Sequence, residues 1–307
     1  MTTTRSEPPA GIVVVDKPAG LTSHQVVGRA RRQLGTRKVG HAGTLDPMAT
    51  GVLVLGVGRA TRLLGQLSLT DKAYQATIRL GQATLTDDAE GETTAAAGAR
   101  GLSQASIEEA LAGLRGGIEQ VPSAVSAIKV GGVRSYARVR SGAEVELAAR
   151  PVTVSRFEVL ARRDATITGP AGEPPDRALP VADLDVAVEC SSGTYVRALA
   201  RDLGAALGTG GHLTALRRTR VGPFTLVEAQ SLDGDALTVT EISVVARRCF
   251  PALDLDAGRA AAVRVGRRLA DTALPAGLTA VFDPDGRFLA LYRPDGADAV
   301  PEAVFVG

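Results

Sequence analysis

The chain has 307 residues and a formal net charge of +2, and its 45% hydrophobic and 22% charged residues are typical of a globular rather than a disordered protein. Its two cysteines, Cys190 and Cys249, are too few for a disulfide framework, and its longest apolar runs are far shorter than the ~20 residues of a membrane-spanning helix. Because the first residues lack the apolar core of a signal peptide, we expect a cytoplasmic protein with no membrane segment.

Apolar periodicity and turn residues predict the secondary structure in chain order. We expect strands at 11–15, 52–57, 73–80, 123–130, 152–161, 183–190 and 213–221, and helices at 23–34, near 103–114, near 134–141 and near 195–207. Ser23 is the predicted N-cap of the first helix, which Gly35 ends, and 39–51 is a predicted glycine-rich loop. Strands and helices follow one another without a regular βαβ repeat, so the predicted fold class is α+β with an antiparallel or mixed sheet.

Two later segments differ from the rest of the chain in composition and in the length of their apolar runs. Residues 163–182 are rich in glycine and proline, and we expect them to form a mobile surface excursion. After about residue 245 the apolar runs become short and are separated by Pro-Asp-Gly turns, with strands expected at 279–282, 288–292 and 303–306. We therefore predict a main domain over 1–245 and a small β-rich domain over 250–307.

Basic residues gather in three segments of the sequence. Residues 1–62 carry nine basic and three acidic groups, 121–150 carry five and two, and 197–220 carry five arginines and one aspartate. If the fold brings these segments together, they form a binding face for a polyanion such as RNA. If it does not, they are three separate solvated surfaces, and the charge counts alone favour this second interpretation.

The densest motif is the segment 38–51, which leads into an apolar strand. Pro47 pushes the backbone of Asp46 out of the helical region, and the glycines around it allow turns or the close approach of a ligand. Taken alone, Asp46 is either a functional carboxylate or the start of a hydrogen-bonded turn. His41, taken alone, is either a functional group or a hydrogen-bonded loop residue.

Four motifs in a fixed order then resemble the TruB family of tRNA pseudouridine synthases: GIVVVDKPAG at 11–20, GHAGTLDPMATG at 40–51, KAYQA at 72–76 and SGTYVR at 192–197. The resemblance covers about residues 11–225. It implies the pseudouridine synthase fold, with a mixed, mainly antiparallel central sheet flanked by helices. It also implies an isomerase that flips out uridine 55 in the T arm of tRNA and converts it to pseudouridine, with no metal and no organic or nucleotide cofactor.

The resemblance implies three catalytic residues. Asp46 matches the catalytic aspartate, which attacks C1′ of the ribose or C6 of the base, or stabilises the cleaved intermediate; the sequence leaves these routes open. Arg197 matches the arginine that pairs with this aspartate, and an adjacent guanidinium favours the charged form of a carboxylate. Tyr74 matches the tyrosine that stacks on the flipped uracil and is a candidate for proton transfer.

The resemblance also implies the contacts that hold the RNA. Groups that replace base stacking are needed because extruding a base from its stack costs a few kcal/mol. The matched residues are His41 against the flipped nucleotides, Tyr195 and Leu216 on the walls of the pocket, and Lys17 in the cleft. The basic segment 121–150 corresponds to an insertion that folds over the T loop, with phosphate contacts from Arg134, Arg138 and Arg140.

Several alternatives stay open at this point. The chain could be a catalytically silent tRNA-binding module, or a related synthase that acts on another RNA uridine. A nucleotide-dependent enzyme is set aside because no glycine-rich phosphate-binding motif is present. Residues 250–307 resemble a PUA-type RNA-binding domain, which implies contact with the acceptor arm. Their six arginines against seven aspartates and one glutamate give this segment a net negative charge. A monomer is the expected state, since no assembly seam is evident.

Overall fold

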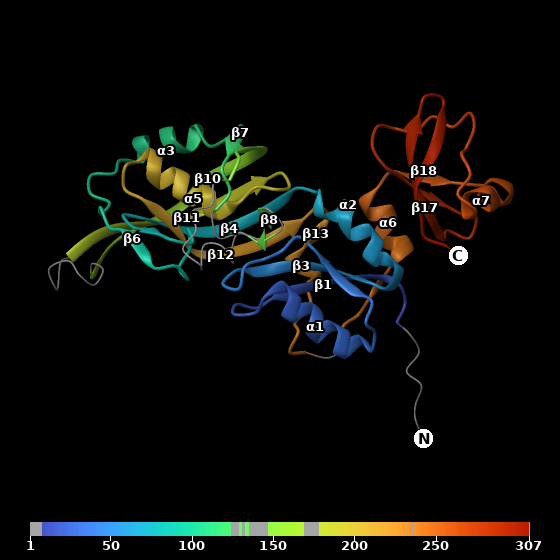
Figure 1. The fold of residues 1–307 in the computed structure, drawn as a ribbon, viewed down its shortest axis with the longest axis horizontal. Coiled ribbons are helices and arrows are strands. Elements are labelled where there is room, and N and C mark those ends of the chain that lie inside the picture. Colours follow the sequence, from blue (N-terminus) through green and yellow to red (C-terminus); the bar gives the residue numbers. More distant parts are fainter. Residues whose placement is uncertain are drawn as a thin grey trace, which may run out of the picture.

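The computed structural model describes residues 8–123, 129–130, 133–134, 147–168, 178–234 and 236–306. In this part of the chain, one long sheet carries helices on both faces, and a second, smaller sheet forms the C-terminal end of the molecule (Figure 1). The predicted α+β class, with its mixed and mainly antiparallel central sheet and its small β-rich C-terminal part, is confirmed.

The long sheet has ten strands: β1 (Gly11–Lys17), β2 (Val39–Ala42), β3 (Thr50–Val57), β4 (Lys72–Leu80), β7 (Gly116–Gln120), β10 (Arg150–Thr168), β11 (Ala178–Cys190), β12 (Gly211–Val221), β13 (Phe224–Thr225) and β14 (Thr240–Glu241). Their order is β14-β1-β3-β12-β4-β11-β10-β7, with β2 on β3 and β13 on β12. Among the pairings described for this sheet, β3 with β12 is the parallel one. It lies at the centre of the sheet, so the chain segments that enter β3 and leave β12 meet there.

The helices that cover the long sheet are α1 (Ser23–Leu34), η1 (Gly58–Leu63), α2 (Leu64–Ser68), α3 (Gln104–Ala112), α5 (Val196–Ala206), η2 (Leu226–Glu228) and α6 (Ile242–Cys249). Helix α1 packs its apolar face on one side of β1 and β3, whereas α2 and α6 pack on the other side. Helices α3 and α5 cover the β4–β11–β12 part of the sheet (Figure 1). The start of α5 therefore lies over the centre of the sheet.

Helix α1 begins one residue earlier than the sequence indicated. Its N-cap is Thr22, whose hydroxyl accepts a hydrogen bond from the Gln25 amide. Ser23, the predicted cap, is buried instead, and its hydroxyl both accepts a bond from the Leu45 amide and donates one to the Leu45 carbonyl. Gly35 ends the helix in the left-handed conformation, as predicted. The first turn of α1 is therefore tied to the segment that carries Asp46.

The prediction of a surface excursion over 163–182 was wrong for its described ends. Residues 163–168 and 178–182 continue the β10–β11 ladder, from Arg163 opposite Asp183 to Thr168 opposite Ala178. The pairing of the two backbones outweighs the neighbouring glycines and prolines there, because β10 and β11 are long strands that bond to one another along their length. Residues 169–177 lie outside the described part of the chain.

Two further expectations change in the middle of the chain. The predicted loop 39–51 begins with strand β2, which pairs with β3. At the start of the predicted helix 134–141, the described backbone is a strand instead, because β9 (Val133–Arg134) pairs with β8 (Lys129–Val130). The rest of the predicted helix and residues 124–128 of the predicted strand 123–130 lie outside the described residues. A second small pairing joins β5 (Ala83–Thr84) to β6 (Thr93–Ala95).

The C-terminal sheet contains β15 (Ala252–Asp254), β16 (Thr279–Phe282), β17 (Phe288–Asp295) and β18 (Asp298–Val304), with α7 (Ala257–Arg264) packed against it. Phe282, Phe288 and Phe305 share one apolar core with residues of β1, β3, α2 and α6. Arg59 of η1 donates a hydrogen bond to the Phe305 carbonyl. This sheet is therefore joined to the long sheet by a continuous core.

Candidate active site

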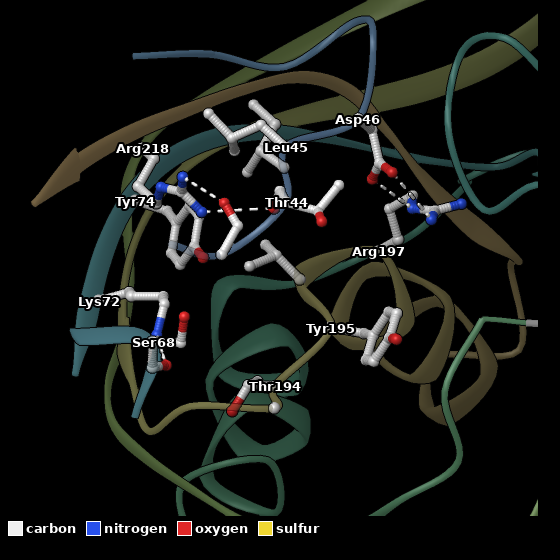
Figure 2. Close-up of a pocket in the computed structure, with 14 residues that line it drawn as sticks. Thr44, Leu45, Asp46, Ser68, Lys72, Tyr74, Thr194, Tyr195, Arg197 and Arg218 are labelled. Carbon is white, nitrogen blue, oxygen red and sulfur yellow. Dashed lines mark hydrogen bonds and ion pairs between the residues drawn. The ribbon is translucent and has the colours of Figure 1, made fainter. Parts of the chain in front are cut away.

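A cavity of about 280 Å³ opens at the centre of the long sheet, where β3, β4 and β12 meet the start of α5 (Figure 2). Four segments that are far apart in the sequence line it, at 43–46, 68–74, 193–197 and 216–218. The lining residues are Gly43, Thr44, Leu45, Asp46, Ser68, Lys72, Tyr74, Gly193, Thr194, Tyr195, Val196, Arg197, Leu216 and Arg218. The cavity thus contains the three residues proposed as catalytic and two of the four proposed as substrate contacts.

The backbone around Asp46 is fixed by bonds to β1 and to the turn that follows it. The Pro47 carbonyl accepts hydrogen bonds from the Gly20 amide, at 2.8 Å, and from Lys17 Nζ, at 3.1 Å. At the entry to β3, Gly51 has φ +99°, and a Cβ there would lie 2.2 Å from the Arg218 carbonyl oxygen. Only glycine allows this approach of β3 to β12. These contacts hold the Asp46 side chain at the wall of the cavity.

Asp46 is paired with Arg197, which projects from the first turn of α5. Arg197 Nε lies 3.0 Å from Asp46 Oδ2, and Arg197 Nη2 lies 3.4 Å from Asp46 Oδ1. The same guanidinium bonds the Thr86 carbonyl at 2.8 Å and lies 3.4 Å from Asp88 Oδ2. The Asp46 side chain is 36% exposed, whereas Arg197 and Asp88 are 6% and 4% exposed. Arg197 is thus a buried cation between two carboxylates, and one of these carboxylates faces the cavity.

Tyr74 and Leu216 come from the neighbouring strands β4 and β12, and both are mostly buried at the cavity wall. Burial raises the pKa of Tyr74, and the charge and hydrogen bond of Arg218 oppose this rise. Tyr195 precedes α5, and its backbone exchanges two hydrogen bonds with the Gln120 side chain. The cavity can therefore hold a planar ring against aromatic and apolar side chains beside a carboxylate.

A second wall of the cavity carries two cations. Arg218 is 1% exposed and donates to the carbonyls of Val52, at 2.8 Å, Gly43, at 3.0 Å, and Thr44, at 3.4 Å. The Lys72 ammonium donates to the carbonyls of Ser68 and Thr70 at the edge of the same wall. Figure 2 shows Lys72, Tyr74 and Arg218 on one side of the cavity and Asp46 with Arg197 on the other.

Lys17 and His41 lie near the Asp46 segment but outside the lining of the cavity. Lys17 is buried, and its ammonium donates to three carbonyls; burial lowers its pKa to about 8. The His41 ring packs edge-on against the His24 ring, with centroids 5.4 Å apart. Burial, then His24 and Arg218, lower the pKa of His41. Lys17 therefore supports the segment that carries Asp46, whereas the His41 ring contacts α1.

The arginines of two predicted basic segments, 121–150 and 197–220, differ in what the structure describes of them. Arg138 and Arg140 lie outside the described residues, and of Arg134 only the backbone in β9 is described. Most arginines of 197–220 have acidic partners: besides Arg197, Arg201 lies near Asp87 and Asp202, Arg217 near Asp16, and Arg220 near Glu189. That segment therefore carries much less free positive charge than its sequence suggested.

Sequence reasoning missed Asp88, Lys72 and Arg218. Lys72 opens the KAYQA motif and Arg218 lies two residues after Leu216, so their positions beside matched residues could have indicated both. Asp88 lies in an acidic run, and nothing in the sequence separates it from its neighbours. Among the described residues, no cluster of three or more His, Cys, Asp or Glu side chains could hold a metal ion. No described helix is long and apolar enough to cross a membrane.

Family models match almost all of the region that contains this cavity. The model of the TruB family pseudouridylate synthase N-terminal domain matches residues 31–196. The model of the tRNA pseudouridylate synthase B C-terminal domain matches 197–243, and that of the tRNA pseudouridine synthase II C-terminal region matches 250–306. Asp46, Tyr74 and Tyr195 fall in the first of these matches, and Arg197 opens the second.

Two complete relatives and two solved structures extend this match. The tRNA pseudouridine synthase B of Nocardia farcinica is 58% identical over 99% of this chain and 95% of that protein. The one of Streptomyces griseus is 56% identical over 99% of both chains. A chain of a Cbf5-Nop10-Gar1 complex has a TM-score of 0.67 over 96% of this chain and 85% of its own length. A chain of an H/ACA RNP bound to a substrate RNA has a TM-score of 0.66 over 99% of this chain and 92% of its own. Both structures are 24% identical to this chain and are similar to it in fold.

The sequence motifs, the paired carboxylate in the cavity and these matches together identify the chain as a member of the TruB family of pseudouridine synthases.

Proposed function

We propose that this protein is an isomerase that converts uridine 55 in the T loop of tRNA to pseudouridine. The observation that carries the proposal is the Asp46–Arg197 pair at a cavity lined by Tyr74 and Leu216. Such a cavity accepts a flat, uncharged base and places a carboxylate beside the sugar to which it is attached. The relatives named tRNA pseudouridine synthase B support tRNA as the substrate.

The reaction needs one group that balances positive charge and others that hold the base while it turns. The bond from ribose C1′ to uracil N1 breaks, the base rotates, and a bond from C1′ to C5 forms; C5 loses its proton and N1 gains one, so no oxidant or cofactor is needed. The Asp46 carboxylate acts at the electron-poor centre, at C1′ or at C6. Arg197 keeps the Asp46 carboxylate oriented through its two contacts.

Further residues hold the flipped nucleotide and the RNA around it. Tyr74 and Leu216 enclose the uracil, and Tyr195 and His41 contact the flipped nucleotides. Lys17 lies at the cleft, where it also holds the Pro47 carbonyl. Arg134, Arg138 and Arg140 contact phosphates of the T arm. The protein acts as a monomer in the cytoplasm, with a main catalytic domain over 1–245 and a small PUA-like domain over 250–307.

Tritium release from T-arm RNA labelled with [5-³H]uridine tests the proposal, because the label leaves C5 only when the new bond forms. We expect release by the wild type and a loss of roughly 10⁴-fold or more in Asp46→Asn, with RNA affinity changed only a few-fold. Asp16→Asn is a matched control, because Asp16 is also 36% exposed and also pairs with an arginine, Arg217. We expect this control to retain activity.

Three outcomes would redirect the assignment. Tight binding without release by the wild type would indicate a silent tRNA-binding module. Release that persists when the target uridine 55 is replaced would indicate a synthase for another uridine. Normal activity of Asp46→Asn would remove Asp46 from the chemistry.

A further inference from the structure

Arg218 and Lys72 are buried cations, and in the described part of the chain neither forms an ion pair with a carboxylate. The contacts of both charged groups are backbone carbonyls, together with the hydrogen bond of Arg218 to Tyr74. They lie close together, since a Cβ on Gly43 would sit 3.4 Å from Arg218 Nη1 and 3.5 Å from Lys72 Cε. Two like charges thus share one wall of the cavity.

This arrangement is unfavourable for folding alone. A buried charge without an opposite charge loses its hydration and regains only part of it from carbonyl dipoles. The two cations also repel one another, and burial and then Arg218 lower the pKa of Lys72 to about 8. Positive charge held in this way at a cavity is typical of a site where negative charge develops during a reaction.

We propose that Arg218 and Lys72 stabilise the negative charge on the uracil ring when its bond to the ribose breaks. The inference rests on the proposed function, since it concerns an intermediate of that reaction. It assigns the two cations a catalytic role toward the negative charge of the base, separate from the role of Asp46 and Arg197.

The charge balance of the cleavage step explains why both walls are needed. When the C1′–N1 bond breaks, its electron pair stays on N1 and spreads over O2 and O4 of the uracil anion. The matching positive charge is left on the ribose at C1′, on the side of the Asp46 carboxylate. When C5 then bonds to C1′, the base gives up this electron pair and its negative charge disappears. The cations therefore interact with negative charge only between cleavage and rejoining. Because this interaction is absent in the bound substrate, it lowers the barrier to cleavage.

The experiment compares two leaving groups in single-turnover reactions. T-arm RNA carries either uridine or 5-fluorouridine at the target position, and loss of the starting nucleoside is followed after nuclease digestion. Fluorine stabilises the base anion, so the enzyme has less charge to stabilise. We expect Arg218→Gln to slow the uridine reaction by about 10²-fold and the 5-fluorouridine reaction by about tenfold less. Lys72→Met is expected to show a smaller change in the same direction.

Controls separate this role from structural support. Arg218→Lys keeps the charge and is expected to recover the uridine rate to within about tenfold of the wild type. Arg217→Lys changes the adjacent residue of β12, which pairs with Asp16 outside the cavity, and is expected to leave both rates unchanged. If Arg218→Gln does not fold, as judged by its melting temperature, Lys72→Met carries the same comparison, with Lys72→Arg as its charge-retaining control.

Equal slowing of the uridine and 5-fluorouridine reactions by Arg218→Gln and Lys72→Met would overturn the inference. A structural or phosphate-binding role would slow both reactions equally, because it does not depend on the leaving group. Failure of the proposed function is visible separately. In that case, the wild type converts neither RNA, and no variant needs to be compared.

Discussion

The two walls of the cavity hold their charges in opposite ways. On one wall, Arg197 is shared between Asp46 and Asp88, so each charge has an opposite charge within 3.4 Å. On the other wall, Arg218 and Lys72 have carbonyl partners and no carboxylate among the described residues. Pairing balances the negative charge of these carboxylates in a site that must receive a polyanion. Incomplete neutralisation leaves a positive field on the side where we expect the base to carry negative charge.

The fold gives the two walls different rigidity. Arg218 and Gly51 face one another in the parallel pairing of β3 and β12, so the cationic wall is part of the sheet itself. Asp46 lies on a segment between strands, and it depends on Arg197 for its orientation. Arg197 depends in turn on the Thr86 carbonyl and on Asp88, both from the connection after β5. The paired wall is therefore the one that a distant substitution disturbs more easily.

Removing the second carboxylate of the paired wall has the largest effect among the following predictions. We expect Asp88→Asn to lower kcat by about 10- to 100-fold with little change in KM, because Arg197 keeps Asp46 but loses the charge that fixes its other side. Asp88 is 4% exposed, so a loss of about 1–3 kcal/mol of folding free energy is also expected. Single-turnover rates and thermal unfolding measure the two effects.

Asp87→Asn is the matched control for Asp88→Asn. Asp87 is the adjacent buried carboxylate, but it faces Arg201 at 3.4 Å rather than Arg197. Its left-handed backbone, with φ +58°, suits asparagine as well as aspartate. We expect a kcat near that of the wild type. An equal loss of kcat in both variants would show that the segment as a whole, and not the charge on Arg197, is what matters.

The cationic wall predicts a decline of activity at alkaline pH. Burial lowers the pKa of Lys72 to about 8, so its charge is lost as the pH rises through that value. We expect the cleavage rate to fall several-fold above about pH 8. The effect on folding has the opposite sign: the unfolded chain keeps this proton up to its ordinary pKa of 10.5, so the stability contribution of Lys72 rises between about pH 8 and 10.5.

Lys72→Arg separates this titration from others near the site. Arginine stays charged throughout the range, so the variant should lose the Lys72 part of the decline. Lys17 has the same pKa, about 8, and holds the Pro47 carbonyl beside Asp46. A pH profile of Lys72→Arg identical to that of the wild type would assign the decline to Lys17 or another group. A melting temperature that fell together with the rate would assign it to unfolding.

The sequence predicted the three residues proposed as catalytic better than the structure that holds them. Asp46, Arg197 and Tyr74 stand in dense motifs, and the structure brings all three to one cavity. The burial of Lys17 was not predictable, because its three carbonyl partners come from a turn and from residue 47, which is distant in sequence. Asp88 was missed for the same reason, since its role depends on a contact with Arg197 of α5, which is distant in sequence.

Local pattern succeeded where local energetics decide the conformation. The end of α1 at Gly35 and strand β16 follow from a left-handed cap and from an apolar run between turns, which neighbouring residues determine. It failed at the described ends of 163–182, where pairing between two long strands outweighs composition. It also failed at Ser23, where a tertiary bond to Leu45 takes the hydroxyl that a cap would use.

Charges outside the cavity should affect binding and leave both walls unchanged. If Arg138 contacts one phosphate of the T arm, Arg138→Ala should weaken tRNA binding and reduce the slope of log K against log salt by about 0.7–0.9. The cleavage rate at saturating enzyme should not change, because no group of the cavity is altered. Arg156→Ala is the control, since Arg156 is an exposed arginine that already pairs with Glu158 and Glu189. An unchanged slope for Arg138→Ala would remove this residue from the interface, and a lower cleavage rate at saturation would mean that the segment 121–150 helps to form the site.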